Sequence, residues 1–176
     1  MIIIPRVDFE NKINKSLAYN PVTAILGPRQ CGKTTLAKIV SNSIENAFFD
    51  LEDPADYELL KSSPKTVLTQ QKGLIVIDEI QRIPELFPLL RVLSDQAGAI
   101  GRFLILGSAA PDLVRKTSES LAERVGFINL SGFLLNEIGP ENIDQLWFRG
   151  GFPKSYLAQN NEQCFSGSAT FYCTVS

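Results

Sequence analysis

Short apolar runs alternate with amphipathic segments along the first 131 residues. Five runs have the length and composition of buried strands, at residues 22–26, 47–51, 73–77, 102–106 and 125–130. Apolar positions recur at helical spacing in residues 8–19, 33–43, 55–61 and 86–97. Strands that alternate with helices indicate an α/β fold with a parallel sheet.

The pattern becomes less regular after the fifth apolar run. Ser120 and Glu123 have the spacing of a capping box, which predicts a helix start just before that run. Short helices are expected from Phe133 onward, with a turn at residues 150–153. Residues 169–175 have the composition of a short strand. We therefore divide the chain into a core, residues 1–131, and a C-terminal helical or irregular segment, residues 132–176.

Composition narrows the class of protein. The 176 residues suffice for one domain, and 44% hydrophobic with 20% charged residues is typical of a globular protein. The net charge of −2 does not indicate a nucleic-acid partner, although the net charge does not rule out a local basic patch. No apolar run reaches the ~18 residues of a membrane helix, so we expect no membrane association and a cytoplasmic location. The absence of histidine leaves carboxylates, hydroxyls, Lys and Arg for catalysis.

The first apolar run leads into a phosphate-binding motif. Residues 27–34 fit G-x-x-x-x-G-K-[ST] at every fixed position, between a predicted strand and a predicted helix. Lys33 is expected to contact the β- and γ-phosphates of a nucleotide, and Thr34 to bind Mg²⁺. A glycine-containing turn is the alternative. The predicted nucleotide contacts are Gly27, Pro28, Arg29, Gln30, Cys31, Gly32, Lys33, Thr34 and Thr35.

Cys31 has two interpretations within this motif. Near a helix N-terminus a thiol pKa can be lowered, so that oxidation would block nucleotide binding. A small residue at a variable position of the loop is the alternative. The three cysteines, Cys31, Cys164 and Cys173, have no metal-ligand spacing and do not indicate a disulfide framework.

The third apolar run ends in two carboxylates, Asp78 and Glu79. Carboxyl ends of parallel strands meet at one edge of a sheet, so both carboxylates are expected near the phosphate loop. Asp78 would hold Mg²⁺ opposite Thr34, and Glu79 would orient and polarise the attacking water. A strand that simply ends in two acids is the alternative.

Two further residues are candidates for contact with the γ-phosphate. Ser108 follows the fourth apolar run, where a polar side chain can sense the phosphate, although a hydroxyl there can also start a helix. Arg124 precedes the fifth run and is a candidate arginine finger, supplied in cis or by a neighbouring subunit. Arg115 competes for this role, and either arginine can instead be a surface residue.

Together these motifs resemble a family of prokaryotic AAA-like P-loop ATPases. The matching segments are G-P-R-Q-C-G-K-T-T at 27–35, F-D-L-E-D-P at 49–54, L-I-V-I-D-E-I-Q at 74–81, L-G-S-A at 106–109, S-L-A-E-R at 120–124 and G-G-F-P at 150–153. The resemblance implies a RecA/AAA-like core with sheet order 5-1-4-3-2, ATP with Mg²⁺ as cofactors, and often a further C-terminal domain. It also implies the roles already given for the loop residues, Asp78, Glu79, Ser108 and Arg124.

Two departures from the family pattern stand out. Glu123 occupies a position where relatives with S-L-A-G-R carry Gly, which affects the backbone path to Arg124. Residues 162–176 do not resemble the usual continuation of the family, so we expect a truncated or frame-shifted end, and residues 132–176 would then be a shortened lid or linker.

The leading prediction is an ATPase that couples hydrolysis to a partner protein or appended domain, with a homo-oligomer as one form of assembly. A nucleotide-binding switch with negligible hydrolysis is the alternative. A small-molecule kinase comes third, because Glu79 has no task in a kinase.

Overall fold

Five parallel strands form the centre of the molecule. The computed structural model describes residues 3–96 and 98–159. The strands are β1 (Val22–Leu26), β2 (Asn46–Asp50), β3 (Leu74–Asp78), β4 (Phe103–Gly107) and β5 (Val125–Asn129). They pair in the order β2-β3-β4-β1-β5, all in parallel, which confirms the predicted order 5-1-4-3-2 counted from the other edge.

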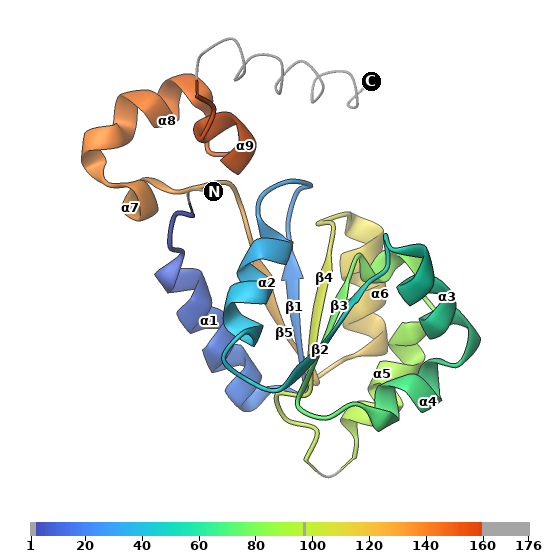
Figure 1. Ribbon diagram of the computed structural model, residues 1–176. Helices are drawn as coiled ribbons and strands as arrows, with labels where there is room; N and C mark the ends of the chain where they lie inside the picture. Colours follow the sequence, from blue (N-terminus) through green and yellow to red (C-terminus); the bar gives the residue numbers. More distant parts are fainter. Residues whose placement is uncertain (1–2, 97, 160–176) are drawn as a thin grey trace.

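Helices cover both faces of this sheet (Figure 1). On one face lie α1 (Val7–Tyr19) and α2 (Lys33–Ser41). The other face is covered by α3 (Pro54–Ser62), α4 (Pro64–Gln70), α5 (Leu86–Ser94) and α6 (Pro111–Ser120), with the short 3-10 helix η1 (Ile80–Arg82) after β3. The result is the three-layer α/β sandwich that the alternating pattern predicts.

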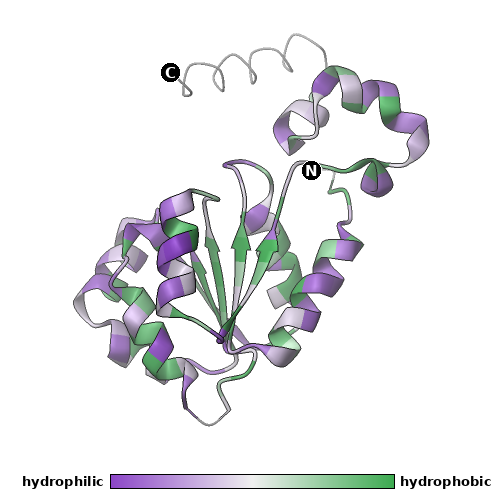
Figure 2. Cartoon of the chain, turned by 180° about the vertical axis from the view of Figure 1, so that it is seen from behind, coloured by the Kyte–Doolittle hydropathy of each residue, from purple (hydrophilic) through white to green (hydrophobic). Residues whose placement is uncertain are grey.

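The two cores follow from side-chain alternation along the strands. In β4, Phe103 and Ile105 pack towards the helices α3–α6, whereas Leu104 and Leu106 pack towards α1 and α2. All five residues of β1, β3 and β4 are buried. Figure 2 shows the corresponding concentration of hydrophobic residues along the strands.

Two helices differ from the predictions, α4 and α6. Pro64 occupies the first turn of α4, where the missing N–H costs no hydrogen bond, so a second helix follows α3 directly. The predicted capping box at Ser120 is wrong, because Ser120 is the last residue of α6. Pro111 begins α6 instead, and its buried residues Leu113 and Thr117 lie four positions apart on one face.

Residues 132–159, the described part of the C-terminal segment, form short helices. These are α7 (Leu135–Ile138), the 3-10 helix η2 (Pro140–Asn142), α8 (Ile143–Arg149) and α9 (Pro153–Tyr156). They lie beyond the carboxyl ends of the strands, beside the N-terminus (Figure 1). The strand expected at residues 169–175 lies outside the described residues. Among the helices that are described, none has the length and hydrophobicity to cross a membrane.

Candidate functional site

The loop between β1 and α2 turns sharply at Gln30 and Gly32. Gly32 has φ 98° and Gln30 has φ 63°, both in the left-handed region. A Cβ atom on Gly27 would lie 2.3 Å from the carbonyl oxygen of Leu130, so a side chain does not fit there. The Gly32 carbonyl accepts a hydrogen bond from the amide of Leu36 at 3.0 Å and so begins α2. The turn and this helix start form the arrangement that binds phosphate groups.

Lys33 is held inside this turn. Its side chain is buried, and its ammonium group donates hydrogen bonds to the carbonyl oxygens of Gly27, at 3.1 Å, and Pro28, at 2.9 Å. A buried ammonium group needs such acceptors. The positive charge is therefore concentrated at the loop, where an anionic phosphate would balance it.

A cleft of about 520 Å³ lies over the loop. It is lined by Arg29, Gln30, Gly32, Lys33, Thr34, Thr35, Glu52, Glu79, Pro153 and Lys154. The structure thus brings predicted phosphate contacts together with the predicted catalytic carboxylate. Pro153 and Lys154 come from the C-terminal segment, and sequence reasoning did not assign them to the site.

Thr34 and Asp78 meet beside this cleft. The hydroxyl of Thr34 donates a hydrogen bond to Oδ2 of Asp78 over 2.5 Å, and the amide of Glu79 donates to Oδ1 over 2.9 Å. Burial raises the pKa of Asp78, while the hydrogen bonds from Thr34 and Glu79 oppose that rise. Hydroxyl and carboxylate oxygens are ligands that Mg²⁺ accepts beside phosphate oxygens, so the pair fits this ion.

Glu79 adopts an unusual backbone conformation at the end of β3. Its φ is 54°, a left-handed value that costs a residue other than glycine of the order of 1–3 kcal/mol and is concentrated at functional sites. Its carboxylate accepts a hydrogen bond from Nε2 of Gln81. The Oε1 atom of Gln81 is buried and has no hydrogen-bond partner within residues 3–96 and 98–159. Sequence reasoning missed the role of Gln81 in holding Glu79.

Ser108 follows β4 at the end of the sheet where the phosphate loop begins. It follows the last residue of β4, Gly107, which is paired with Leu26, the last residue of β1. The carbonyl of Gly107 accepts a hydrogen bond from the amide of Gly27 at 3.3 Å. Half-buried Ser108 therefore stands at the edge of the sheet where the loop begins.

Arg124 lies at the amino end of the strands, whereas the phosphate loop lies at their carboxyl end. Its carbonyl accepts a hydrogen bond from the amide of Val22, the first residue of β1, whereas the phosphate loop follows the last residue. Five strand residues span about 16 Å. The Arg124 guanidinium pairs with Asp95, with Nε 2.6 Å from Oδ1. The structure therefore does not bring Arg124 to Lys33 within one chain. The competing Arg115 is exposed on α6.

Burial decides between the two interpretations of Cys31. The side chain is fully buried, and this desolvation raises the pKa of the thiol, although Lys33 and Arg6 oppose the rise. The first interpretation, a lowered thiol pKa, is not supported, because Cys31 packs in the hydrophobic core on the α1 and α2 face of the sheet. A small residue that fills the loop is the interpretation that remains.

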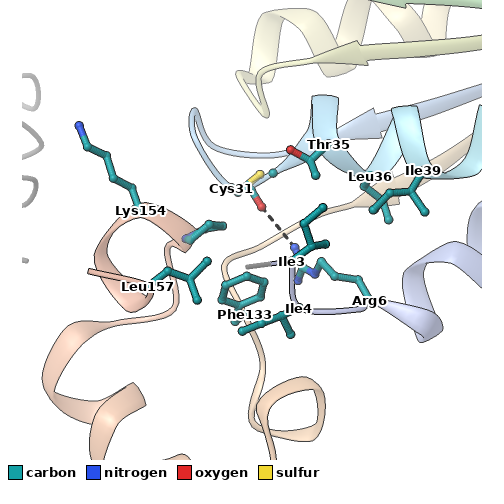
Figure 3. Close-up of a pocket in the computed structure, with 12 residues that line it drawn as sticks. Ile3, Ile4, Arg6, Cys31, Thr35, Leu36, Ile39, Phe133, Lys154 and Leu157 are labelled. Atoms are coloured by element: carbon teal, nitrogen blue, oxygen red, sulfur yellow. Dashed lines mark hydrogen bonds between the residues drawn. The ribbon is translucent and has the colours of Figure 1, made fainter. Parts of the chain in front are cut away.

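A second, largely apolar cavity of about 270 Å³ lies beside the loop (Figure 3). Its lining comes from three separate parts of the chain, namely Ile3, Ile4, Arg6, Cys31, Gly32, Thr35, Leu36, Ile39, Phe133, Pro153, Lys154 and Leu157. Gly32, Thr35, Pro153 and Lys154 also line the phosphate-side cleft, so the two hollows are adjacent. Sequence reasoning missed this cavity because its apolar lining residues outside the loop, such as Ile3, Phe133 and Leu157, belong to no motif.

The phosphate loop after β1, the carboxylates after β3 and the strand order together define the class of P-loop nucleoside-triphosphatases. The chain belongs to the family described as "AAA domain", whose family model matches residues 19–139. This confirms the resemblance to AAA-like P-loop ATPases.

Two curated relatives cover most of the chain. The uncharacterized proteins Mb2031c of Mycobacterium bovis and Rv2008c of Mycobacterium tuberculosis are each 48% identical over 161 residues, which is 92% of this chain. The match covers 36% of each relative, so the chain corresponds to about a third of their length.

Solved structures share the fold. The Walker-type ATPase PABY2304 of Pyrococcus abyssi has a TM-score of 0.61 at 14% identity, covering 97% of this chain and 72% of that protein. The RuvB Holliday junction branch migration motor of Thermotoga maritima has a TM-score of 0.53 at 17% identity, covering 95% of this chain and 70% of that one. At these identities the likeness concerns the fold.

Proposed function

We propose that this domain binds ATP together with Mg²⁺ and hydrolyses it to ADP and phosphate. One observation carries the proposal: Lys33, Thr34 and Glu79 line a single cleft, and Thr34 donates a hydrogen bond to Asp78. A phosphate contact, a metal-binding pair and a carboxylate for water are the parts that phosphoryl transfer to water requires.

The loop would bind the phosphates. Backbone amides and the positive end of α2 attract the anion, and Lys33 exchanges its carbonyl partners, Gly27 and Pro28, for phosphate oxygens. Thr34 and Asp78 would hold Mg²⁺, which supplies neutralisation of the phosphate charge when it is bound. Both side chains then give up their mutual hydrogen bond.

Glu79 would orient and polarise the attacking water. Its carboxylate lines the cleft, and Gln81 fixes it on the other side. Because the Glu79 side chain is already held in place, it loses little further conformational freedom when it positions the water. Ser108, beside the loop, would sense the γ-phosphate.

The base of ATP would occupy the apolar cavity beside the loop. A flat aromatic base gains free energy by leaving water for apolar walls such as Ile3, Ile39 and Phe133. Because Pro153 and Lys154 line this cavity and the cleft, residues 132–159 would act as a lid or linker that contacts both ends of the nucleotide.

The arginine finger would come from a neighbouring subunit. Arg124 lies at the far edge of the sheet from its own loop, so it can reach only the nucleotide of another copy. A homo-oligomer is thus the active form of the proposed ATPase. Arg124 of a neighbouring subunit would thus respond to whether ATP or ADP is bound. This response could drive a partner protein or a further part of a longer protein, since the two relatives are longer than the segment they share with this chain.

The position of Arg124 also favours a second candidate function, a nucleotide-binding switch with negligible hydrolysis. Phosphate release, measured with Mg²⁺ and with EDTA over a range of protein concentrations, distinguishes the two. The ATPase predicts Mg²⁺-dependent release whose rate per subunit rises with concentration. Tight ATP binding with a flat, near-zero rate supports the switch, and absence of ATP binding contradicts both.

A further inference from the structure

Arg6 is a buried arginine that no motif identifies. It is 5% exposed, and its guanidinium makes five hydrogen bonds. Nε and Nη2 donate to the carboxylate of Glu137 at 2.6 and 2.8 Å, and the same Nη2 donates to the carbonyl of Gly132 at 3.1 Å. Nη1 donates to the carbonyls of Ser131, at 3.0 Å, and Cys31, at 3.3 Å. These bonds match the five N–H donors of arginine.

The surroundings of Arg6 fix its position further. Its guanidinium lies 4.6 Å from the ring centre of Phe9 and 5.4 Å from that of Phe133. The side chain of Glu137, which is 4% exposed, neutralises the charge and accepts a third hydrogen bond from the amide of Leu134 at 2.7 Å. Planar stacking and a bidentate carboxylate suit arginine and not lysine.

One of the five bonds reaches into the phosphate loop, as Figure 3 shows for Arg6 and Cys31. The carbonyl of Cys31 shares a peptide unit with the amide of Gly32. In a trans peptide the C=O and N–H groups point in opposite directions. By holding the carbonyl, Arg6 turns the Gly32 amide away from itself, and Gly32 lines the phosphate-side cleft.

The other bonds reach the C-terminal segment. Gly132, whose carbonyl binds Arg6, packs so closely on Gly151 that a Cβ atom there would lie 2.7 Å from the Gly151 backbone. The amide of the next residue, Phe133, donates to the carbonyl of Gly151 at 2.6 Å. Two residues further along, Pro153 begins α9 and lines the cleft. Arg6 thus touches both the loop and the segment that borders it.

We propose that Arg6 is a positioning residue that orients the Cys31–Gly32 peptide for phosphate binding and couples the phosphate loop to the C-terminal segment. The inference rests on the proposed binding of ATP. Because coupling between sites is reciprocal, ATP would stabilise the packing of residues 132–157, and that packing would favour ATP.

The test uses Arg6→Lys, with Arg102→Lys as the matched control. Lysine keeps the charge near Glu137 but cannot hold all the acceptors at once. Arg102 also donates to two backbone carbonyls, those of Gln71 and Gly73, but at the start of β4, at the opposite edge of the sheet. The dissociation constant for ATP with Mg²⁺ is measured by titration, and amide hydrogen exchange at Phe133 and Tyr156 is followed with and without ATP.

In the wild type and in Arg102→Lys, ATP is expected to slow exchange at Phe133 and Tyr156. Arg6→Lys should weaken ATP binding at least about tenfold and remove the effect of ATP on exchange, which a merely structural role would not do. Wild-type affinity together with ATP-dependent exchange in Arg6→Lys would overturn the role of Arg6. Failure of the wild type to bind ATP would overturn the proposed function as well.

Glu137→Gln keeps the proposal testable if Arg6→Lys does not fold. This variant weakens the link to the C-terminal segment but leaves the bond from Arg6 to Cys31. ATP affinity is expected to change less than about threefold, while the slowing of exchange at Phe133 by ATP declines. Slowing equal to that of the wild type would overturn the coupling.

Discussion

Thr34 Oγ1 lies 2.5 Å from Asp78 Oδ2, although 44 residues separate them in the chain. The contact joins the start of α2 to the end of β3, because parallel strands deliver their carboxyl ends to one edge of the sheet. Two oxygen ligands suited to Mg²⁺ therefore stand beside the phosphate loop.

The ionised carboxylate of Asp78 is expected to reduce stability while no metal is bound. Burial raises its pKa above the usual value of 3.8, so the folded protein loses stability as pH rises through that raised pKa. At pH 7, without Mg²⁺ or nucleotide, Asp78→Asn should unfold at a higher temperature than the wild type, yet bind ATP with less dependence on Mg²⁺. Below pH 3.8 the stability difference should vanish. Thermal unfolding at several pH values measures this.

Asp112→Asn provides the control for Asp78. Asp112 is an exposed residue in the first turn of α6, 3.6 Å from Arg115. Its replacement should change the unfolding temperature little, because exposed ion pairs contribute little. A lower unfolding temperature for Asp78→Asn than for the wild type at pH 7 would contradict the predicted effect of burial.

Lys33→Ala should weaken ATP binding at least about tenfold, or about 1.4 kcal/mol, because the loop loses its buried positive charge. Lys38→Ala is the matched control in the same helix, since Lys38 is exposed and lies over the ring of Phe48. Its affinity for ATP should equal that of the wild type. Equal affinities of the two variants in a titration would rule out the phosphate role of Lys33.

The sequence predicted the sheet and the phosphate loop because both depend on local patterns. The run that ends in Asp78 and Glu79 is buried on both faces, and the glycines at 27 and 32 meet steric demands of the turn. The helix α6 was not predicted because most of its residues are polar, and two of its ten residues, Leu113 and Thr117, are buried.

The apolar cavity and the contacts of Arg6 were beyond sequence reasoning. They join residues near positions 6, 31 and 133, and no spacing along the chain signals such a meeting. The position of Arg124 needed the structure for the same reason. Only the register of β5 against β1 shows that it stands at the far edge.

Glu123 occupies a left-handed conformation with φ 63°. A residue with a Cβ atom is disfavoured there by roughly 1–2 kcal/mol. Glu123→Gly should therefore raise the free energy of unfolding by about 1 kcal/mol. The matched control, Glu119→Gly in helix α6, should lower it by about 1 kcal/mol. Chemical denaturation measures both, and destabilisation by Glu123→Gly would contradict the account.

Mixing two inactive variants tests whether Arg124 acts between subunits. Arg124→Ala retains Glu79, and Glu79→Gln retains Arg124, so a mixed oligomer would contain some complete sites. Each variant alone should bind ATP and release little phosphate, while the mixture should recover part of the wild-type rate. Arg115→Ala should behave as the wild type. A mixture no more active than its parts would exclude a finger supplied in trans.

The rate of phosphate release by Glu79→Gln, compared with its affinity for ATP, tests the central claim most directly. The claim predicts a fall of at least about 100-fold in the rate with wild-type ATP affinity, because only the water loses its carboxylate. Asp112→Asn, which changes an exposed carboxylate on α6 outside the cleft, should keep the wild-type rate. Undiminished phosphate release by Glu79→Gln would contradict the account.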